Sequence, residues 1–251
     1  MDKEIVLITG ATSGIGEATA ELLAENRYRL IIAGRRNDRL DELKNHIGKL
    51  TYVHTLNFDI RHRDEVDRAI DSLPPEWQDV DILVNNAGLA AGLDHFHESD
   101  IDDWEQMIDT NLKGLLYISR KITPRMVERG TGHVINIGSI AGREMYEKGN
   151  VYSATKHAVE ALSRGMKMDM LNDGIRVSTI SPGLVDTEFS LVRFKGDGER
   201  AKEPYRGMRP LSGRDVAEAI LFMITRPPHV NINDLLIMPT AQAAAVMVHR
   251  E

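Results

Sequence analysis

Near its start the sequence runs from a β-branched apolar stretch, Ile5–Ile8, through a glycine-rich segment, Thr9 to Gly16, into an amphipathic stretch ending at Glu25. Glycine permits a tight strand-to-helix turn and lets the backbone approach a pyrophosphate with no Cβ in the way. The free N–H groups and the positive dipole end of the following helix attract such an anion. A glycine cluster alone is a weak signal, but a strand, glycines and a helix in this order predict a dinucleotide site in an α/β fold.

The same alternation of short apolar runs and amphipathic stretches continues along the chain. The predicted strands are Ile5–Ile8, Leu30–Ala33, Tyr52–Leu56, Ile82–Val84, His133–Ile137, Arg176–Ile180 and Asn231–Met238, and the predicted helices are Gly16–Glu25, Asp38–His46, Asp64–Ser72, Asp103–Val127, Tyr152–Leu171 and Asp215–Thr225. Apolar strands separated by helices indicate a parallel sheet that is covered on both faces. Because crossovers are right-handed, we expect a doubly wound, Rossmann-type α/β fold with a seven-stranded parallel sheet, and we expect residues 1–251 to form one domain.

One region departs from this alternation. Val185–Pro210 shows no clear period, contains Lys195-Gly196-Asp197-Gly198, and is longer than connections in compact domains usually are. Long irregular loops late in an α/β fold often cover the active site, so we expect residues 185–210 to be a substrate lid. A surface excursion without a function is the alternative.

The composition narrows the class of function. The formal net charge is -7 and no Lys/Arg run dominates, so nucleic-acid binding is not expected. The absence of cysteine excludes disulfides, thiolate nucleophiles and Cys-ligated metal sites. No apolar run approaches the roughly 20 residues that span a bilayer and no signal peptide is visible, so we expect a cytoplasmic protein with no membrane partner. We interpret His95 and His97 as a polar surface loop, because no helical His pair accompanies them, and we expect no metal.

The glycine spacing differs from the usual dinucleotide fingerprint, because three residues separate Gly10 from Gly14. The pattern Thr9-Gly-x-x-x-Gly-x-Gly16, with Asn85-Asn86-Ala87-Gly88 after the fourth strand, resembles the short-chain dehydrogenase/reductase family. The resemblance runs over essentially the whole chain. It implies that the Asn-Asn-Ala-Gly segment steadies the central sheet and borders the cofactor.

The charge at the end of the second strand distinguishes an NAD site from an NADP site. An NAD site has a carboxylate there for the ribose hydroxyls, whereas an NADP site has a cation for the 2′-phosphate. This chain carries Gly34-Arg35-Arg36 and no acid at that place, which predicts NADP as the cofactor. Many NADP-preferring relatives have a further basic residue in the glycine loop, where this chain has Ser13. Selection of NADP over NAD must therefore depend on the two arginines alone.

A Tyr-x-x-x-Lys pattern occurs twice, as Tyr117–Lys121 and as Tyr152–Lys156. Only the second pair follows a strand that ends in Ser139, and in parallel sheets the active-site residues lie at the carboxyl ends of the strands. We therefore interpret the first pair as a packing and solvation pair.

The charge of a nearby lysine is large enough to activate a tyrosine. Lowering the pKa of a phenol by about two from roughly 10 takes ~2.7 kcal/mol. An ammonium about 5 Å away supplies roughly 3 kcal/mol at an effective dielectric of about 20, so Tyr152 is predicted to be the acid/base.

The family resemblance implies further roles. Ser139 would hold the substrate oxygen near Tyr152, Lys156 would also bind the nicotinamide ribose, and Asn111 would support a proton-relay water. Asp59 and Ile60 would flank the adenine, and Pro182–Thr187 would close over the nicotinamide. The expected cofactor contacts are Gly10, Ala11, Thr12, Ser13, Gly14, Ile15, Gly16, Arg35, Arg36, Asp59, Ile60, Asn86, Ala87, Gly88, Tyr152, Lys156, Pro182, Gly183, Leu184, Val185 and Thr187.

Several stretches, among them Trp104-x-x-Met-Ile-Asp-Thr-Asn111 and Glu188–Asp197, are similar to the NADP-dependent serine and 3-hydroxy-acid dehydrogenases. That group interconverts L-serine, L-allo-threonine or 3-hydroxypropionate-type acids with 3-oxo acids or semialdehydes. Such a substrate requires a cation for its carboxylate, and Arg193, Lys195 and Arg143 are the candidates, with Arg193 preferred. Family members are commonly tetramers, and the apolar tail Ala241–His249 could pack on a neighbouring subunit, so we expect a homotetramer.

Other readings of the same residues stay open. One is a reductase for another carbonyl class, such as sugars, steroids or acyl thioesters, with the same catalytic residues. A second is a non-catalytic NADP-binding regulatory protein, although such proteins usually lack the Tyr or the Lys that this chain keeps. A methyltransferase with a similar sheet does not account for Ser139, Tyr152 and Lys156 together.

Overall fold

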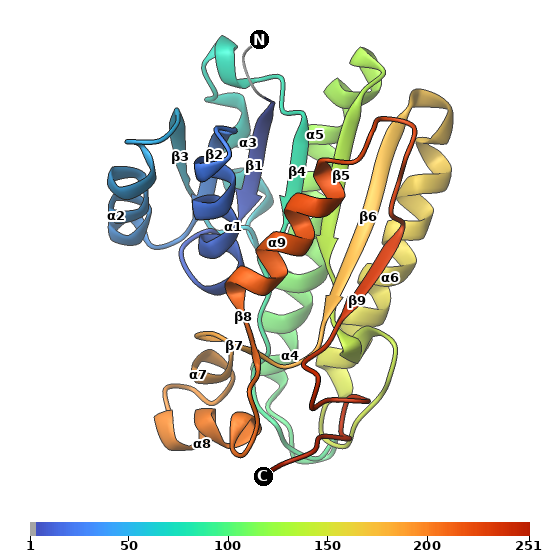
Figure 1. The fold of residues 1–251 in the computed structure, drawn as a ribbon. Coiled ribbons are helices and arrows are strands. Elements are labelled where there is room, and N and C mark those ends of the chain that lie inside the picture. The colour runs from blue at the N-terminus through green and yellow to red at the C-terminus, as the bar shows by residue number, and fades with distance from the viewer. Residues whose placement is uncertain (1–3) are drawn as a thin grey trace.

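A seven-stranded parallel sheet forms the centre of the computed structural model, which describes residues 4–251. The strand order is β3-β2-β1-β4-β5-β6-β9, as Figure 1 shows, and this confirms the predicted doubly wound sheet. The strands are β1 (Ile5–Thr9), β2 (Arg29–Gly34), β3 (Val53–Asn57), β4 (Ile82–Asn85), β5 (Gly132–Ile137), β6 (Ile175–Pro182) and β9 (Asp234–Ile237). The chain moves outward from β1 to β3 and then returns to β4, so the switch point lies between β1 and β4.

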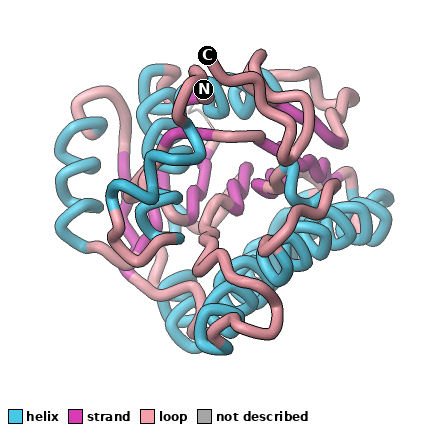
Figure 2. The backbone as a smooth tube through the Cα atoms, turned by 90° about the horizontal axis from the view of Figure 1, so that it is seen from below, coloured by secondary structure: helices cyan, strands magenta, loops and turns pink. Residues whose placement is uncertain are grey.

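Helices cover both faces of the sheet, as Figure 2 shows in a view from the carboxyl ends of the strands. The longer helices are α1 (Gly14–Glu25), α2 (Asn37–Ile47), α3 (Arg63–Asp71), α4 (Ile101–Ile108), α5 (Leu115–Arg129), α6 (Asn150–Asp169) and α9 (Gly213–Ile224). Side chains alternate along each strand, so Val6 and Ile8 pack with α1, α2 and α9, whereas Leu7 packs with α3 and α5. Burial on both faces explains why the strands are continuous apolar runs.

The predicted helix Asp103–Val127 is not uniform. It consists of α4, a π-helical stretch η2 (Asp109–Gly114), and α5. The late strand is shorter than predicted and begins at Asp234, because the Asn231 side chain bonds the backbone N–H and C=O of Val177 in place of a strand partner. In both places the regular hydrogen bonding of the predicted element is interrupted, by a π-helical stretch in the helix and by the Asn231 side chain before the strand.

Residues 185–210 are more ordered than the sequence suggested. They contain β7 (Val185–Asp186), α7 (Phe189–Arg193) and α8 (Gly198–Lys202), and β7 pairs with β8 (Leu211–Ser212). The expectation of an irregular loop was therefore wrong. Two helices of five residues each are too short to display a helical period, which is why they escaped detection.

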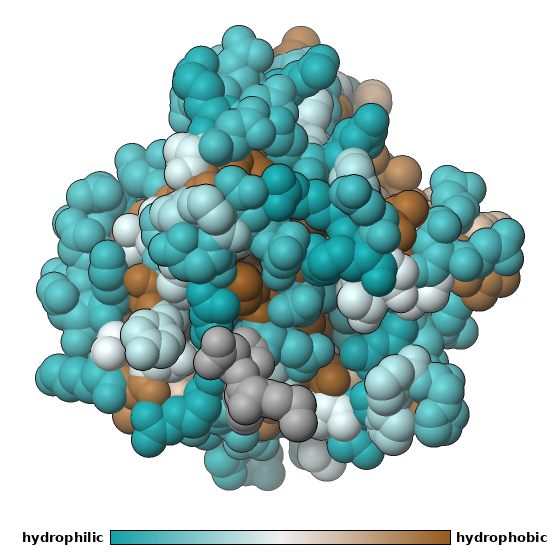
Figure 3. All heavy atoms as spheres, turned by 90° about the horizontal axis from the view of Figure 1, so that it is seen from above, coloured by the Kyte–Doolittle hydropathy of each residue, from teal (hydrophilic) through white to brown (hydrophobic). Residues whose placement is uncertain are grey.

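The carboxyl ends of the strands carry a cavity of about 540 Å³. Figure 1 shows α7, α8 and the C-terminus gathered beneath these strand ends. The opposite face, around the amino ends of the strands, is mostly hydrophilic in Figure 3. The fold thus provides its large cavity at the switch point, where doubly wound sheets bind ligands.

Candidate active site

The glycine turn between β1 and α1 is fastened to the end of β4. Asn86 Nδ2 donates to the carbonyl oxygens of Thr9 and Gly10 at 2.9 and 3.0 Å. Gly10 and Gly14 have φ values of 64° and 59°, and a Cβ on Gly16 would lie 2.3 Å from the Gly10 oxygen. The turn therefore requires glycine at these positions, and it leaves the N-terminus of α1 open to the cavity.

Asn85, the residue before Asn86, links elements of the fold to one another. Asn85 Nδ2 donates to Asn136 Oδ1 at 2.8 Å and to Ser119 Oγ at 2.9 Å, which ties β4 to β5 and to α5. Thr9 Oγ1 accepts the N–H groups of Asn86 and Ala87 at 3.1 and 3.0 Å. The segment after β4 thus holds the glycine turn against the sheet.

Two arginines from the end of β2 line the same cavity. Arg35 Nη1 lies 3.5 Å from Asp59 Oδ2, and about half of the Arg35 side chain is exposed. Burial acts to raise the pKa of Asp59, but hydrogen bonds from Arg61 outweigh it and lower the pKa to about 2. Asp59 therefore stays ionised beside Arg35, and it is shared with Arg61, which holds it at 2.7 Å.

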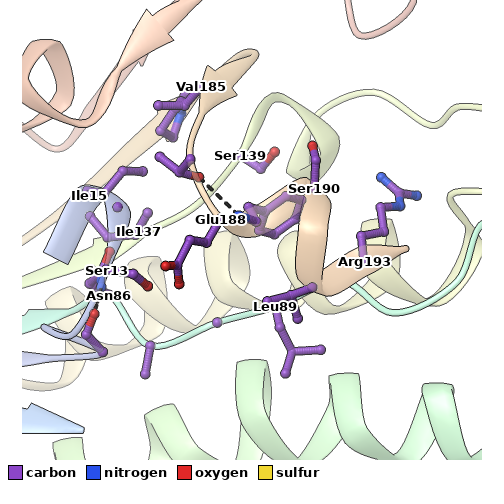
Figure 4. Close-up of a pocket in the computed structure, with 18 of the residues that line it drawn as sticks. Ser13, Ile15, Asn86, Leu89, Ile137, Ser139, Val185, Glu188, Ser190 and Arg193 are labelled. Atoms are coloured by element: carbon purple, nitrogen blue, oxygen red, sulfur yellow. Dashed lines mark hydrogen bonds between the residues drawn. The ribbon is translucent and has the colours of Figure 1, made fainter. Parts of the chain in front are cut away.

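Arg36 is fixed more tightly than Arg35. Its Nη2 donates to the Thr12 carbonyl at 2.9 Å, and its Nη1 donates to Glu188 Oε2 at 2.8 Å. Glu188 follows β7, so this ion pair joins the glycine turn to residues 185–210. Figure 4 shows the Glu188 carboxylate between Ser13 and Asn86 on one side and Ser190 and Arg193 on the other. Glu188 belongs to a stretch that resembles the 3-hydroxy-acid dehydrogenases, but the sequence indicated no partner and no role for its side chain.

Three side chains meet at the end of β5. Ser139 caps a short 3₁₀ turn by accepting the Ala141 N–H at 3.1 Å, and its hydroxyl is near enough to Tyr152 to lower the pKa of the phenol. Lys156, one helical turn after Tyr152 on α6, donates from Nζ to the Ile137 carbonyl at 2.8 Å. All three side chains are buried and all line the cavity.

Burial is the largest influence on both ionisable groups of this set. It raises the pKa of the Tyr152 phenol well above its usual value, while the hydrogen bond from Ser139 and the charge of Arg193 lower it. Burial also lowers the pKa of Lys156 to about 8, against the opposing charge of Glu160. We expected the Lys156 ammonium to lower the pKa of Tyr152 and left out burial, but in the structure burial raises that pKa. The Lys156 ammonium is 6.0 Å from the centre of the Tyr152 ring and is engaged with a carbonyl.

Asn111 lies in the π-helical stretch η2. Its side-chain amide pairs with both backbone groups of Leu89, each at 2.8 Å, and donates to Thr155 Oγ1 at 3.1 Å. A Cβ on Gly88 would lie 3.3 Å from Asn111 Oδ1 and 3.5 Å from Lys156 Nζ. Asn111 therefore positions the 88–89 backbone beside Lys156. π-helical stretches are frequent at functional sites, but nothing in the sequence had indicated this one.

The segment after β6 crosses the cavity above the glycine turn. A Cβ on Gly14 would lie 3.1 Å from Thr187, so these two segments are in close contact. Leu184 N–H donates to Gln242 Oε1 at 2.8 Å, and a Cβ on Gly183 would lie 2.4 Å from the same oxygen. Gln242 belongs to the tail 241–249, and its side chain holds the segment of its own chain that lines the cavity.

The three candidate cations have different surroundings. Lys195 pairs with Asp103 at 3.0 Å, and Arg143 pairs with Asp234 and, at 3.8 Å, with Glu160. Arg193 alone of the three lies at the phenol, with its guanidinium carbon 5.8 Å from the centre of the Tyr152 ring. The structure thus brings one of the candidates to the site and places the other two in ion pairs.

The discarded motifs lie elsewhere. Neither Tyr117 nor Lys121 lines the cavity, and Lys121 pairs with Asp71 at 2.8 Å. The rings of His95 and His97 stack with centroids 5.9 Å apart. Within residues 4–251, no group of three or more His, Asp or Glu side chains is arranged to hold a metal. No helix in this range has the length and apolar character needed to cross a bilayer.

Comparison with known proteins adds an independent line of evidence. A sequence model described as "short chain dehydrogenase" matches residues 4–196. The NADP-dependent 3-hydroxy acid dehydrogenase YdfG of Escherichia coli (strain K12) is 48% identical over 249 residues, which are 98% of this chain and 100% of that protein. Sulfoacetaldehyde reductase 2 of Chromohalobacter salexigens is 42% identical and covers 99% of each chain.

Solved structures give the same result. The closed form of a serine dehydrogenase complexed with NADP+ superimposes with a TM-score of 0.92 at 48% identity, and the match covers 98% of this chain and 100% of that one. A serine dehydrogenase from Escherichia coli matches with a TM-score of 0.82 at 43% identity, covering 95% and 99%. Both matches extend over the whole architecture described above.

Proposed function

The chain belongs to the short-chain dehydrogenase family, and from this premise we propose that it is an NADP(H)-dependent oxidoreductase that interconverts 3-hydroxy acids with 3-oxo acids or semialdehydes. The observation that carries the proposal is that the buried side chains of Ser139, Tyr152 and Lys156 together line the cavity at the switch point. Full-length identity of 48% to an NADP-dependent 3-hydroxy acid dehydrogenase supports the reaction class.

The residues around the cavity fit NADP. The glycine turn lines the cavity with Gly10 and Gly14, which carry no Cβ, and the N-terminus of α1 offers N–H groups for a pyrophosphate. Arg35 and Arg36 are suited to the 2′-phosphate, because guanidinium groups bind phosphate in a bidentate manner. Asp59, Ile60, Asn86–Gly88 and Pro182–Thr187 would line the remainder. When bound, the cofactor supplies the acceptor or donor of a hydride.

The chemistry of this chain's own residues is proton transfer and positioning. During oxidation Tyr152 Oη accepts the proton of the substrate hydroxyl, and during reduction it returns that proton to the forming alcohol. Ser139 Oγ hydrogen-bonds the reacting oxygen and keeps it beside Tyr152. Lys156 holds a positive charge near the phenol, which stabilises the tyrosinate against the burial that disfavours it. Asn111 positions the 88–89 backbone next to Lys156.

The proposed substrates are short acids of the L-serine, L-allo-threonine and 3-hydroxypropionate type. The relatives named above act on 3-hydroxy acids, serine and sulfoacetaldehyde, and each of these carries an acid group a short distance from the reacting carbon. We treat residues 1–251 as one dehydrogenase domain in which residues 185–210 form the lid over the substrate. Contacts from Glu188 to Arg36 and from Arg193 to Gly92 support that role, because they join this segment to both ends of the cavity.

We further propose a homotetramer in the cytoplasm. Large apolar side chains are exposed on four elements: Leu116 on α5, Met168 on α6, Phe222 on α9 and Leu236 on the edge strand β9. Exposed apolar side chains of this size are typical of subunit interfaces, and a tetramer with twofold symmetry needs more than one such interface. A cysteine-free sequence agrees with a reducing compartment. Light scattering coupled to size-exclusion chromatography tests the assembly, and a monomer at micromolar concentration would refute it.

The deciding experiment for the function is a panel of substrates. Initial rates with NADP+ and with NAD+ are measured for 3-hydroxypropionate, L-serine and L-allo-threonine, and for a sugar alcohol, a hydroxysteroid and a 3-hydroxyacyl thioester. We expect the short acids to give the highest kcat/KM, and NADP+ to be preferred over NAD+. Preference for one of the other classes would replace the substrate assignment. Cofactor binding without turnover of any substrate would indicate a regulatory protein.

A further inference from the structure

Glu160 is a buried carboxylate that has no role in the chemistry proposed above. It lies on α6 one helical turn after Lys156, and because residues four apart share a helix face, the two side chains leave the helix on the same side. Only 9% of the Glu160 side chain is exposed. Glutamate is rarely buried unless it is paired, so the surroundings of this side chain indicate what it does.

The carboxylate of Glu160 is attached to the end of β6. Ser181 Oγ donates to Glu160 Oε1 at 2.7 Å, and Ser181 is buried. Arg143 Nε lies 3.8 Å from the same oxygen, but the Arg143 guanidinium also pairs with Asp234 on β9. Within residues 4–251, the closest hydrogen-bond donor to this carboxylate is thus a neutral hydroxyl, and the nearby guanidinium is shared with a second acid.

The same side chain packs against residues 138–142, which we call the Ser139 turn. A Cβ on Gly138 would lie 3.1 Å from Glu160 Oε1, and a Cβ on Gly142 would lie 3.3 Å from Glu160 Cγ. These two glycines stand at the two ends of the Ser139 turn, and Ser139 itself lines the cavity. Glu160 therefore supports from behind the turn that presents Ser139 to the cavity.

Lys156 lies within reach of the charge of Glu160. Both residues are buried, and Lys156 Nζ donates to the Ile137 carbonyl at 2.8 Å. In the part of the chain that the structure describes, no direct ion pair joins the two, so the carboxylate acts on the ammonium through space. Burial lowers the pKa of Lys156 to about 8, and the charge of Glu160 opposes that decrease. Charges interact more strongly in a buried region than in water, because little solvent screens them.

We propose that Glu160 is a positioning residue of the active site, whose buried carboxylate supports the Ser139 turn and provides a counter-charge for the Lys156 ammonium. The inference rests on the proposed function, because Ser139 and Lys156 belong to the same site. Without the carboxylate, Lys156 would lose its proton closer to neutral pH, and the positive charge that stabilises the Tyr152 tyrosinate would be lost with it. Glu160 does not itself line the cavity, so it acts through Ser139 and Lys156.

The other charged and titratable groups around this pair come from several elements. They are Tyr152 on α6, Arg143 and Tyr146 after β5, Arg193 on α7, Tyr205 before β8 and Asp234 on β9. Asp234 is the only acid in this set, and its charge is engaged by Arg143. Glu160 is therefore the acid whose removal should be felt at Lys156.

Glu160→Gln tests the counter-charge, because glutamine keeps the size and an acceptor for Ser181 but carries no charge. The alkaline limb of kcat/KM is measured with NADPH and the carbonyl compound that corresponds to the best substrate of the panel above. We expect the midpoint of the limb to fall by about one pH unit, as for the loss of an opposite charge near an ionisable group, and the rates well below the limb to stay nearly unchanged. A limb that stays in place or moves to higher pH would overturn the proposal.

Two further variants at the same position separate charge from support. Glu160→Asp keeps the charge and should keep the limb near its wild-type position. Glu160→Ala removes charge and support together, so kcat should fall about tenfold or more at every pH through misplacement of Ser139, while NADPH affinity changes little. Wild-type kcat in Glu160→Ala would overturn the positioning role.

Two variants at other positions complete the test. Arg143→Met removes the cation nearest to Glu160 and should move the limb to higher pH, the direction opposite to Glu160→Gln. Asp169→Asn is the matched control, because Asp169 is an exposed acid at the C-terminal end of the same helix. Its charge is screened from Lys156, so the limb should not move. An equal shift in Asp169→Asn would show that the limb reports net charge and not Glu160.

An NMR titration of the lysine side-chain carbons separates this inference from the proposed function, because it requires no turnover. The Lys156 resonance is identified by its absence in Lys156→Arg. We expect a pKa of about 8 in the wild type and a value about one lower in Glu160→Gln. Equal values would overturn the inference. If the values differ but no 3-hydroxy acid is turned over, the proposed function fails while the coupling of Glu160 to Lys156 stands.

Discussion

Glu188→Gln should tighten the binding of NADP+ and leave the binding of NAD+ nearly unchanged. In the structure, Glu188 Oε2 accepts a hydrogen bond from Arg36 Nη1 at 2.8 Å, so the carboxylate occupies one edge of a guanidinium assigned to the 2′-phosphate. Glutamine keeps the size and removes the competing negative charge. Arg36 stays oriented after the substitution, because its Nη2 also donates to the Thr12 carbonyl at 2.9 Å.

The magnitude follows from the exposure of the pair. The side chains of Arg36 and Glu188 are 41% and 40% exposed, and ion pairs of this kind contribute at most about 1 kcal/mol. Removing that competition should lower the dissociation constant of NADP+ by up to about fivefold, since about 1.4 kcal/mol corresponds to tenfold. The gain should shrink at high ionic strength, because exposed charges are screened.

The assay is a double-mutant cycle on equilibrium dissociation constants for NADP+ and NAD+. Arg36→Ala alone should weaken NADP+ by roughly 10- to 100-fold, the range for hydrogen bonds to charged groups, and should affect NAD+ little. In the Arg36→Ala background the benefit of Glu188→Gln should disappear. Glu199→Gln, which changes an exposed acid that pairs with Lys202 on α8, is the control. A gain that persists without Arg36, or that is equal for NAD+, would refute the competition.

Three further outcomes are expected. Tyr152→Phe should abolish turnover while changing NADPH affinity less than about twofold, as measured by steady-state rates and fluorescence titration; retained activity would move the acid/base role to another group. Gly16→Ala should destabilise the protein by about 1–3 kcal/mol in urea unfolding, because its Cβ would lie 2.3 Å from the Gly10 oxygen, whereas Gly165→Ala, with nothing within 4 Å, should gain about 0.5–1 kcal/mol. Burial lowers the pKa of His133 to about 3, so its stabilising contribution is complete above the unfolded value of about 6.5 and is lost as the pH falls toward 3. Unfolding free energies at a series of pH values should therefore fall less steeply in His133→Gln, and an unchanged slope would contradict the assignment.

Much of the fold could be predicted from the local pattern of apolar residues in the sequence. Each strand is an apolar run that is buried on both faces, and each long helix has one apolar face, so their order along the chain determines the alternation. The catalytic candidates follow from the same order, because Ser139 ends a strand and Tyr152 and Lys156 share a helix face. The glycine turn is equally local, since positive φ values and the missing Cβ concern consecutive residues.

The sequence pattern could not predict the short helical elements. A π-helical stretch at Asp109–Gly114 and the five-residue helices α7 and α8 owe their stability to packing and not to a period in the sequence. The side-chain amide of Asn111, for example, is held by the backbone of Leu89 at a separation of 22 residues. The role of Gln242 was missed for the same reason, because its partner Leu184 lies 58 residues earlier.

Four features depend on residues close together in the chain and could therefore be predicted: the order of strands and helices, the glycine turn, the two arginines at the end of β2 and the Tyr-x-x-x-Lys face. Three others depend on how the chain folds: burial dominates the pKa of Tyr152, Arg193 and not Lys195 or Arg143 lies at the phenol, and Glu188 pairs with Arg36. Burial and charge pairing depend on which residues meet in space. Arg193 meets Gly92 across 101 residues and Arg36 meets Glu188 across 152, distances over which sequence spacing carries no information about contact.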